Sequence, residues 1–187
     1  MARKKQYDEA EVVEKAMELF WQKGYDATSM TMLEEVMGIN KFSIYSSFGS
    51  KQGLFLESLK CYNSRVGNTL ENFKNGTRGV EDIKQFFYDS VSSNFKSDHI
   101  KGCLVTNTYN EFSDSDDKII KEQMSSFMDN LKSIIIEKLK MNSSMDEATI
   151  EKKANFLLLA KHGLAAAARV NTKKEIEDFI ELTFINI

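Results

Sequence analysis

Hydrophobic residues recur at helical spacing along almost the whole chain. Apolar side chains return every three or four positions between successive turn signals, which is the period of an amphipathic helix. Alternating runs typical of strands are missing, and the sequence has no proline. The pattern therefore predicts an all-α protein of about nine helices. The expected helices lie near residues 8–24, 29–37, 41–47, 51–73, 80–95, 102–112, 117–139, 144–170 and 172–184.

The turn between the second and third of these helices carries the most specific pattern. Ser29 can cap the second helix and Asn40 the third, and Gly38 supplies the left-handed backbone of a sharp turn. The third helix is too short to be stable alone, so its neighbours must hold it. A small helical hairpin within a bundle has this pattern, and so does a helix-turn-helix that presents a polar helix to the DNA major groove.

The local charge favours the DNA-binding alternative. The net charge of the chain is −3, so any surface for nucleic acid must be local. Residues 36–56 contain no Asp or Glu, and a surface that faces phosphates needs such an absence of carboxylates. The basic N-terminal arm is either a plain tail or a contact to phosphates and the minor groove. The DNA-binding residues expected on this basis are Arg3, Lys4, Ser29, Asn40, Lys41, Phe42, Ser43, Tyr45, Ser46, Ser47 and Lys51.

Nothing in the sequence indicates catalysis, a metal or another cofactor. The chain has only two histidines, His99 and His162, and lacks a phosphate-binding loop, a nucleophile motif and metal-ligand spacing. Its two cysteines form no disulfide framework. No segment has the length and apolar composition of a membrane span or a signal sequence. We therefore expect a cytoplasmic protein that is not an enzyme and has no contact with a membrane.

Several short motifs follow one another in a fixed order near the N-terminus. They are AMELFWQKG at 16–24, ATSM at 27–30, GINK at 38–41, and then Ile44, Tyr45, Phe48, Ser50 and Lys51. With these motifs, residues 10–56 resemble the DNA-binding domain of the TetR family of bacterial transcriptional repressors. The resemblance implies a DNA-binding domain at 1–52 and a helical domain for ligand binding and dimerisation at 53–187. Three residues depart from the family pattern. The family usually has a small residue at the position of Glu34, commonly Ser at the position of Asn40, and an aromatic residue or His at the position of Ser47.

The second half of the chain is rich in aromatic and Met side chains, as a plain hydrophobic core or a ligand cavity would be. The run GCLVTNTYNE at 102–111 adds polar groups to a helix expected to be buried, and buried polar groups need partners. It also resembles a GCL-x-x-N-x-x-x-E signature in one branch of TetR regulators. Cys103, near a helix N-terminus, is a candidate sensor of electrophiles. The ligand-binding residues expected are Phe87, Val91, Cys103, Asn107, Tyr109, Phe127 and Leu131.

The last two helices are candidates for self-association. Small residues at 163–168 permit close approach of two helices, either in a tight hairpin or between subunits. The resemblance implies pairing across a two-fold axis into a four-helix bundle, with Leu164, Ala166, Phe179 and Phe184 in the interface. The resulting hypothesis is a homodimeric repressor that a small apolar or aromatic effector releases from operator DNA. The alternative is a helical protein-interaction module without DNA binding.

Overall fold

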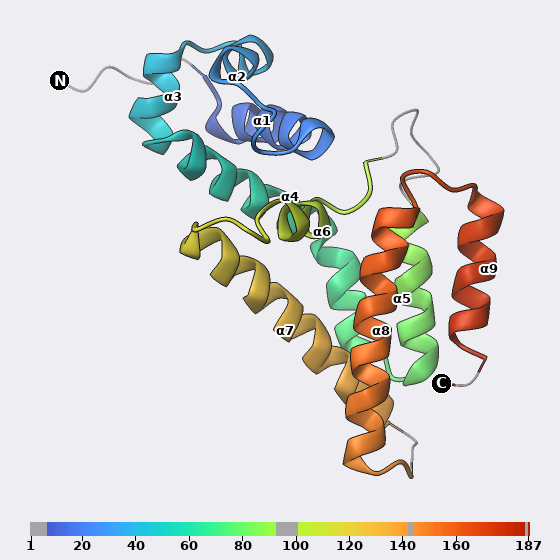
Figure 1. The fold of residues 1–187 in the computed structure, drawn as a ribbon. Helices are drawn as coiled ribbons and strands as arrows, with labels where there is room; N and C mark the ends of the chain where they lie inside the picture. Colours follow the sequence, from blue (N-terminus) through green and yellow to red (C-terminus); the bar gives the residue numbers. More distant parts are fainter. Residues whose placement is uncertain (1–6, 93–100, 142–143, 186) are drawn as a thin grey trace. The chain divides into compact units, whose positions relative to one another are not determined.

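The computed structural model describes residues 7–92, 101–141, 144–185 and 187, and within these ranges the regular elements are nine helices (Figure 1). The prediction of an all-α protein with about nine helices is confirmed. The helices are α1 Glu9–Lys23, α2 Met30–Met37, α3 Lys41–Phe48, α4 Lys51–Asn75, α5 Val80–Ser92, α6 Leu104–Glu111, α7 Lys118–Lys140, α8 Glu147–Ala167 and α9 Lys173–Thr183.

The chain divides into two compact units, Met1–Val66 and Gly67–Ile187. The division falls within α4, so the first part of this helix belongs to the first unit and its last turns belong to the second. No helix in the described part of the chain combines the length and the apolar composition required to cross a membrane.

Aromatic rings form the centre of the first unit. Phe20 of α1 is completely buried, and its ring meets the edge of Phe55 of α4 at a centroid distance of 4.9 Å. Leu33 of α2 and Ile44 of α3 are also fully buried. Burial of one such side chain stabilises a fold by about 1.5–3 kcal/mol. The short helix α3 can therefore be stabilised by the burial of Ile44 and by the hydrogen bonds at its two ends.

Side-chain caps start the helices where the sequence predicts them in the first unit. Ser29 accepts a hydrogen bond from the Met32 amide at 3.2 Å, and Asn40 accepts one from the Ser43 amide at 2.9 Å. Gly38 has the left-handed backbone that the turn requires, with φ of 68°. These predictions of the helix-turn-helix caps and its glycine are confirmed.

Two predicted helix starts in the second unit are wrong by two residues. Helix α8 begins after Asp146 rather than after Ser144, because the Asp146 carboxylate accepts hydrogen bonds from both the amide and the hydroxyl of Thr149 at 2.9 Å. Helix α6 begins at Leu104 rather than at Gly102, because Gly102 has a φ of 70° and cannot continue into a right-handed helix.

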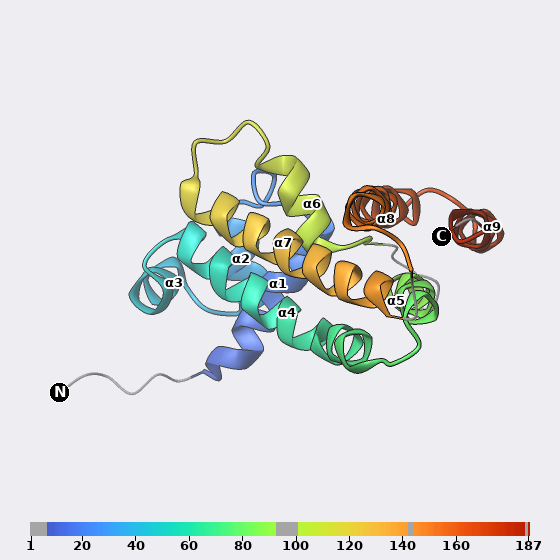
Figure 2. The same ribbon diagram turned by 90° about the horizontal axis from the view of Figure 1, so that it is seen from below.

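The core of the second unit lies between α5, α7, α8 and α9, and Figure 2 shows α5, α8 and α9 seen nearly along their axes. α7 and α8 make the most extensive contact between two helices of this unit. Phe87 of α5 is fully buried and meets Phe184 edge to face at 5.1 Å. The last turns of α4 contribute Phe73, which stacks on Phe86 of α5 at 4.5 Å.

Candidate functional site

Helix α3 displays aromatic and polar side chains on its outer surface. Phe42 is 80% exposed and Tyr45 is 40% exposed, although large apolar residues of this kind are usually buried. Lys41 and Ser46 are exposed as well, and Ser43 and Ser47 are half-buried. The Lys41 ammonium lies 5.7 Å from the centroid of the Tyr45 ring. The surface thus combines a cation, hydroxyl groups and aromatic edges, which are the groups that contact base edges and phosphates.

Both ends of α3 are fixed by hydrogen bonds. At its start, the Lys41 amide donates to the Glu34 carboxylate at 2.5 Å, and Asn40 caps the Ser43 amide. At its end, the Gly49 amide donates to the Tyr45 carbonyl at 2.8 Å, with Gly49 at a φ of 74°. Glu34, which departs from the family pattern at the helix crossing, therefore has a structural role here. It satisfies a backbone donor that would otherwise be unpaired at the helix N-terminus.

Tyr7 is a contact of α3 that the sequence pattern did not reveal. Its hydroxyl lies 2.6 Å from the Ser47 hydroxyl and donates to the Ser43 carbonyl at 3.4 Å. The Ser47 hydroxyl is therefore already engaged in a hydrogen bond within the protein. The two residues predicted on the N-terminal arm, Arg3 and Lys4, lie outside the described residues.

Lys51 stands at the start of α4 next to the predicted surface. Its ammonium lies 4.3 Å from the centroid of the Tyr25 ring, and the residue is half-buried. The neighbouring Ser50 caps α4 by accepting a hydrogen bond from the Gly53 amide at 2.9 Å. Packing on an aromatic ring keeps the Lys51 charge near the N-terminus of α4, where backbone N–H groups favour anions.

The predicted ligand-binding residues divide into a buried group and a group on α6. Phe87, Val91 and Leu131 are at most 3% exposed and belong to the core of the second unit, and Phe127 packs against that core. On α6, Cys103 and Asn107 are half-buried, and the Asn107 amide donates to the Lys101 carbonyl at 3.0 Å.

Tyr109 of α6 contacts His162 of α8. Tyr109 is 43% exposed, and its ring meets the edge of His162 at 5.5 Å. The His162 Nε2 atom lies 2.8 Å from the Met128 sulfur. Burial lowers the pKa of His162, and the positive charge of Lys161 lowers it further. His162 is thus half-buried and held by its neighbours, and a cavity lined by all seven predicted residues stays a prediction.

The second unit buries two lysines, which sequence reasoning did not single out. Lys138 of α7 is fully buried and donates to the carbonyls of Lys74 and Gly76, with the Asp82 carboxylate at 4.0 Å. Lys161 of α8 is 6% exposed, and its ammonium lies 5.7 Å from the Phe86 ring centroid. Burial lowers the pKa of Lys161. The signal was present in the sequence, because each lysine falls on the apolar stripe of its helix.

The residues predicted for a dimer interface have different environments. Leu164 is fully buried in the core of its own unit, so its side chain is already used within the protomer. Ala166 is exposed, Phe179 is 41% exposed, and Phe184 is half-buried against Phe87. Three other apolar side chains of α8 and α9 are more exposed than these, and none of them was predicted to lie in the interface. They are Phe156 at 51%, Leu159 at 70% and Leu182 at 68%.

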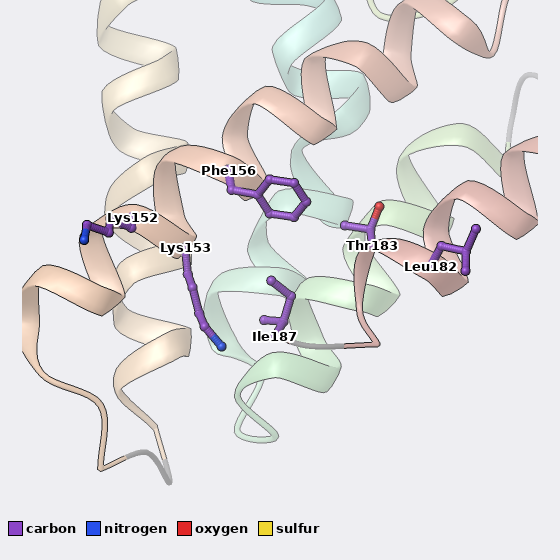
Figure 3. A pocket seen from close by; sticks show the side chains of 6 residues that line it. All are labelled: Lys152, Lys153, Phe156, Leu182, Thr183 and Ile187. Atoms are coloured by element: carbon purple, nitrogen blue, oxygen red, sulfur yellow. The ribbon is translucent and has the colours of Figure 1, made fainter.

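An open groove of about 330 Å³ lies at one end of this apolar surface (Figure 3). Phe156, Thr183 and Ile187 turn toward a common space, while Lys152 points away from it. The remaining lining residues are Lys153 and Leu182. This groove contains none of the residues predicted to bind the effector.

Comparison with known proteins associates the first unit with one family. Residues 12–58 match the family described as bacterial regulatory proteins, tetR family. The chain is 30% identical over 109 residues to YezE, an uncharacterized HTH-type transcriptional regulator of Bacillus subtilis (strain 168), covering 58% of this chain and 56% of YezE. It is 34% identical over 107 residues to the HTH-type transcriptional repressor ComR of Escherichia coli (strain K12), covering 56% and 51%. The chain thus spans about half the length of the curated relatives it matches.

The whole fold is similar to that of solved regulators. One is a cysteine mutant of the TetR family transcriptional regulator CifR in complex with 26-bp double-strand operator DNA. The TM-score is 0.81, the match covers 97% of both chains, and the sequence identity is 24%. At this identity the similarity concerns the fold, and it extends to the second unit, which the family match at 12–58 does not cover.

Proposed function

Because the chain belongs to the TetR family of bacterial transcriptional regulators, we propose that it is a homodimeric repressor that a small-molecule effector releases from operator DNA. Regulators of this family are DNA-binding proteins and not enzymes. In this proposal residues 1–52 form the DNA-binding domain and residues 53–187 bind the effector and dimerise. Such a protein acts in the cytoplasm, where the DNA is.

The surface of α3 is the observation that carries the proposal. Phe42 is 80% exposed on a helix whose two ends are fixed by hydrogen bonds. Exposure of an aromatic ring is costly in water, and a fixed helix loses little conformational freedom when it binds. Residues 36–56 add no carboxylate that would repel phosphates. A rigid, acid-free surface with aromatic and hydroxyl groups suits insertion into the major groove.

Dimerisation is proposed to use the exposed apolar surface of α8 and α9. Phe156, Leu159 and Gly163 follow one another at spacings of three and four residues, so they share one face of α8. Phe179 and Leu182 extend the apolar surface on α9. A contiguous exposed apolar surface of this kind marks an interaction site. Of the interface residues expected from the sequence, Ala166 and Phe179 suit this surface, and Leu164 does not because it is buried.

The effector is proposed to act through α4, the helix that the two units share. A ligand shifts an equilibrium between two states only if it binds one of them better. In the proposal, the effector favours a position of α4 in which the two copies of α3 no longer match successive major grooves. By linkage, operator DNA then weakens effector binding by the same factor.

A gel-shift titration with DNA from the protein's own genomic neighbourhood tests the function. The wild type is expected to bind one fragment at least ~1,000-fold more tightly than a scrambled duplex of equal length. Lys41→Ala, on α3, is expected to weaken this binding. Lys15→Ala removes an exposed cation of α1 in the same unit and serves as the matched control. Equal binding to specific and scrambled DNA would favour the alternative of a protein-interaction module.

A further inference from the structure

We propose that Phe42 is a specificity-determining residue that reads the C5-methyl group of thymine in the major groove of the operator. This role of Phe42 rests on the proposed function, because it names the chemical group that α3 recognises on its DNA partner. Thymine is the only base of unmodified DNA that carries this methyl group. Each half-site of the operator should therefore contain a thymine at the position that Phe42 covers.

The Phe42 ring lies on a side of α3 that the core of the first unit does not use. The residue is 80% exposed, whereas Ile44, two positions later, is completely buried and anchors the helix. Two residues along an α-helix are about 200° apart around its axis, so these two side chains point in nearly opposite directions. Tyr45, three positions after Phe42, is 40% exposed and shares the outer side with it. Phe42 therefore adds little to the packing of α3 and presents its ring to a partner.

Phe42 also occupies the part of α3 from which base edges are reached. It is the second residue of the helix, which begins at Lys41 after the Asn40 cap. In a helix-turn-helix, residues near the N-terminus of the recognition helix contact the base edges. This end of α3 is fixed, because the Lys41 amide donates to Glu34 at 2.5 Å and the Ser43 amide donates to Asn40 at 2.9 Å. The ring thus projects from a fixed backbone when the helix enters the groove.

The chemistry of the Phe42 ring limits what it can recognise, because the side chain has no polar atom. The base edges in the major groove present nitrogen, oxygen and amino groups, and thymine adds the one apolar group, its methyl. A ring that covers this methyl removes apolar surface from water on both sides of the contact. Against a purely polar base edge, the same ring would displace water without supplying a hydrogen bond. The contact therefore favours a T·A pair.

The hydroxyl groups near Phe42 do not supply this selectivity. Ser46 is exposed, and a hydroxyl both donates and accepts, so it can bond to any base edge. The Ser47 hydroxyl lies 2.6 Å from that of Tyr7 and is engaged within the protein. Residues 36–56 contain no carboxylate, the group that selects the amino group of cytosine. Phe42 thus contributes a preference for one base that the hydroxyl groups of α3 lack.

Replacement of thymine by deoxyuridine tests this role, because it removes the methyl group and keeps the hydrogen-bonding groups of the base. The full-length chain is titrated with the fragment that the gel shift identifies, with uracil at one thymine at a time and then at symmetry-related thymines. At the contacted position we expect wild-type affinity to fall about 3- to 5-fold, which is the value of one buried carbon group. With uracil in both half-sites, the two losses should multiply to about 10- to 20-fold.

Two variants assign the loss to Phe42. Phe42→Ala should bind thymine and uracil operators equally at the contacted position, although both more weakly than the wild type does. Because the residue is 80% exposed, this substitution leaves the packing of the first unit intact. Lys41→Ala is the matched control, since it removes the neighbouring exposed cation. It should weaken binding to both DNAs and keep the preference for thymine.

The assignment to Phe42 is overturned if uracil at no thymine weakens binding of the wild type. It is also overturned if Phe42→Ala retains the preference for thymine, which would place the methyl group against another residue. Either result leaves specific operator binding intact, so it contradicts the role of Phe42 alone. A chain that binds no fragment more tightly than a scrambled duplex would instead overturn the proposed function, and the role of Phe42 would fall with it.

Discussion

The two units of the chain place their unusual side chains in opposite environments. In the first unit, aromatic rings that are normally buried lie on the surface of α3, where Phe42 is 80% exposed. In the second unit, ammonium groups that are normally exposed lie inside, at Lys138 and Lys161. The first unit thus exposes apolar surface that a partner could cover, and the second unit buries charges that its own fold must accommodate. The exposed rings suit a macromolecular partner, and the buried lysines differ in the carbonyl and carboxylate partners that the fold gives them.

The largest effect is expected from separating the two protomers. Leu159→Glu places a charge at the centre of the proposed α8 and α9 interface, and the charge has no partner in a buried interface. Operator affinity should fall by about 100-fold or more, because two linked half-site contacts become two independent ones. Sedimentation velocity should show monomers, and the gel shift should show the loss of affinity.

Ile119→Glu is the matched control for the interface variant. Ile119 is 53% exposed on α7, outside the proposed interface, so its replacement should leave both the dimer and operator binding intact. A monomeric Leu159→Glu protein that binds the operator normally would contradict the proposed role of the dimer.

The next effect sharpens the contrast between the two buried lysines. Lys138→Met should lower the free energy of unfolding by about 2–4 kcal/mol, because it removes the donor to the Lys74 and Gly76 carbonyls and leaves the buried Asp82 carboxylate with Arg78 as its cation. Lys161→Met should leave it unchanged or raise it by about 1 kcal/mol, because it replaces a cation packed on the Phe86 ring by an apolar side chain in a site that is 6% exposed. Urea denaturation at one fixed protomer concentration measures both. Equal destabilisation by the two substitutions would remove the distinction between them.

A smaller effect concerns the dependence of stability on pH. Burial lowers the pKa of Lys161 in the folded protein, so between this pKa and the unfolded value the unfolded state holds more protons. The free energy of unfolding should therefore rise with pH in that window, by at most about 1.4 kcal/mol per pH unit. The rise should be absent in Lys161→Met. Cys103 and His162, the neighbouring titratable groups, are present in both proteins, so the difference between the two pH profiles isolates Lys161.

The smallest effect is expected at Lys51, near the start of α4. Lys51→Ala should weaken binding to all DNA sequences alike and reduce the slope of log affinity against log salt by about one. Lys60→Ala is the control, because Lys60 is exposed on α4 and paired with Glu57. An unchanged slope in Lys51→Ala would mean that Lys51 contacts no phosphate and only packs on Tyr25.

The features that sequence predicts best are those that depend on neighbouring residues. The caps Ser29 and Asn40 and the turn glycine Gly38 act over three or four positions, and each is where the pattern places it. The start of α8 was predicted near residue 144, but the helix begins at Glu147. Asp146 forms the cap, since Thr149 offers it two donors.

Contacts between distant segments could not be predicted in this way. Tyr7 and Ser47 are separated by 40 positions in the sequence, and no local sequence pattern predicts the hydrogen bond between them. The same limit separates Lys138 from Lys161. Both lie on apolar stripes, but only the packing of other segments decides that one receives carbonyl partners and the other does not.

Protection of guanine N7 atoms from methylation reports directly whether α3 occupies the major groove, because these atoms lie there. With the wild-type protein on its operator, we expect two protected sets of guanines whose centres lie about one helical turn, 10–10.5 bp, apart. Protection should weaken in both sets together in the double variant Phe42→Ala and Tyr45→Ala, which removes the exposed rings of α3. A single protected set, or protection that survives the loss of both rings, would contradict the binding of two α3 helices in successive major grooves.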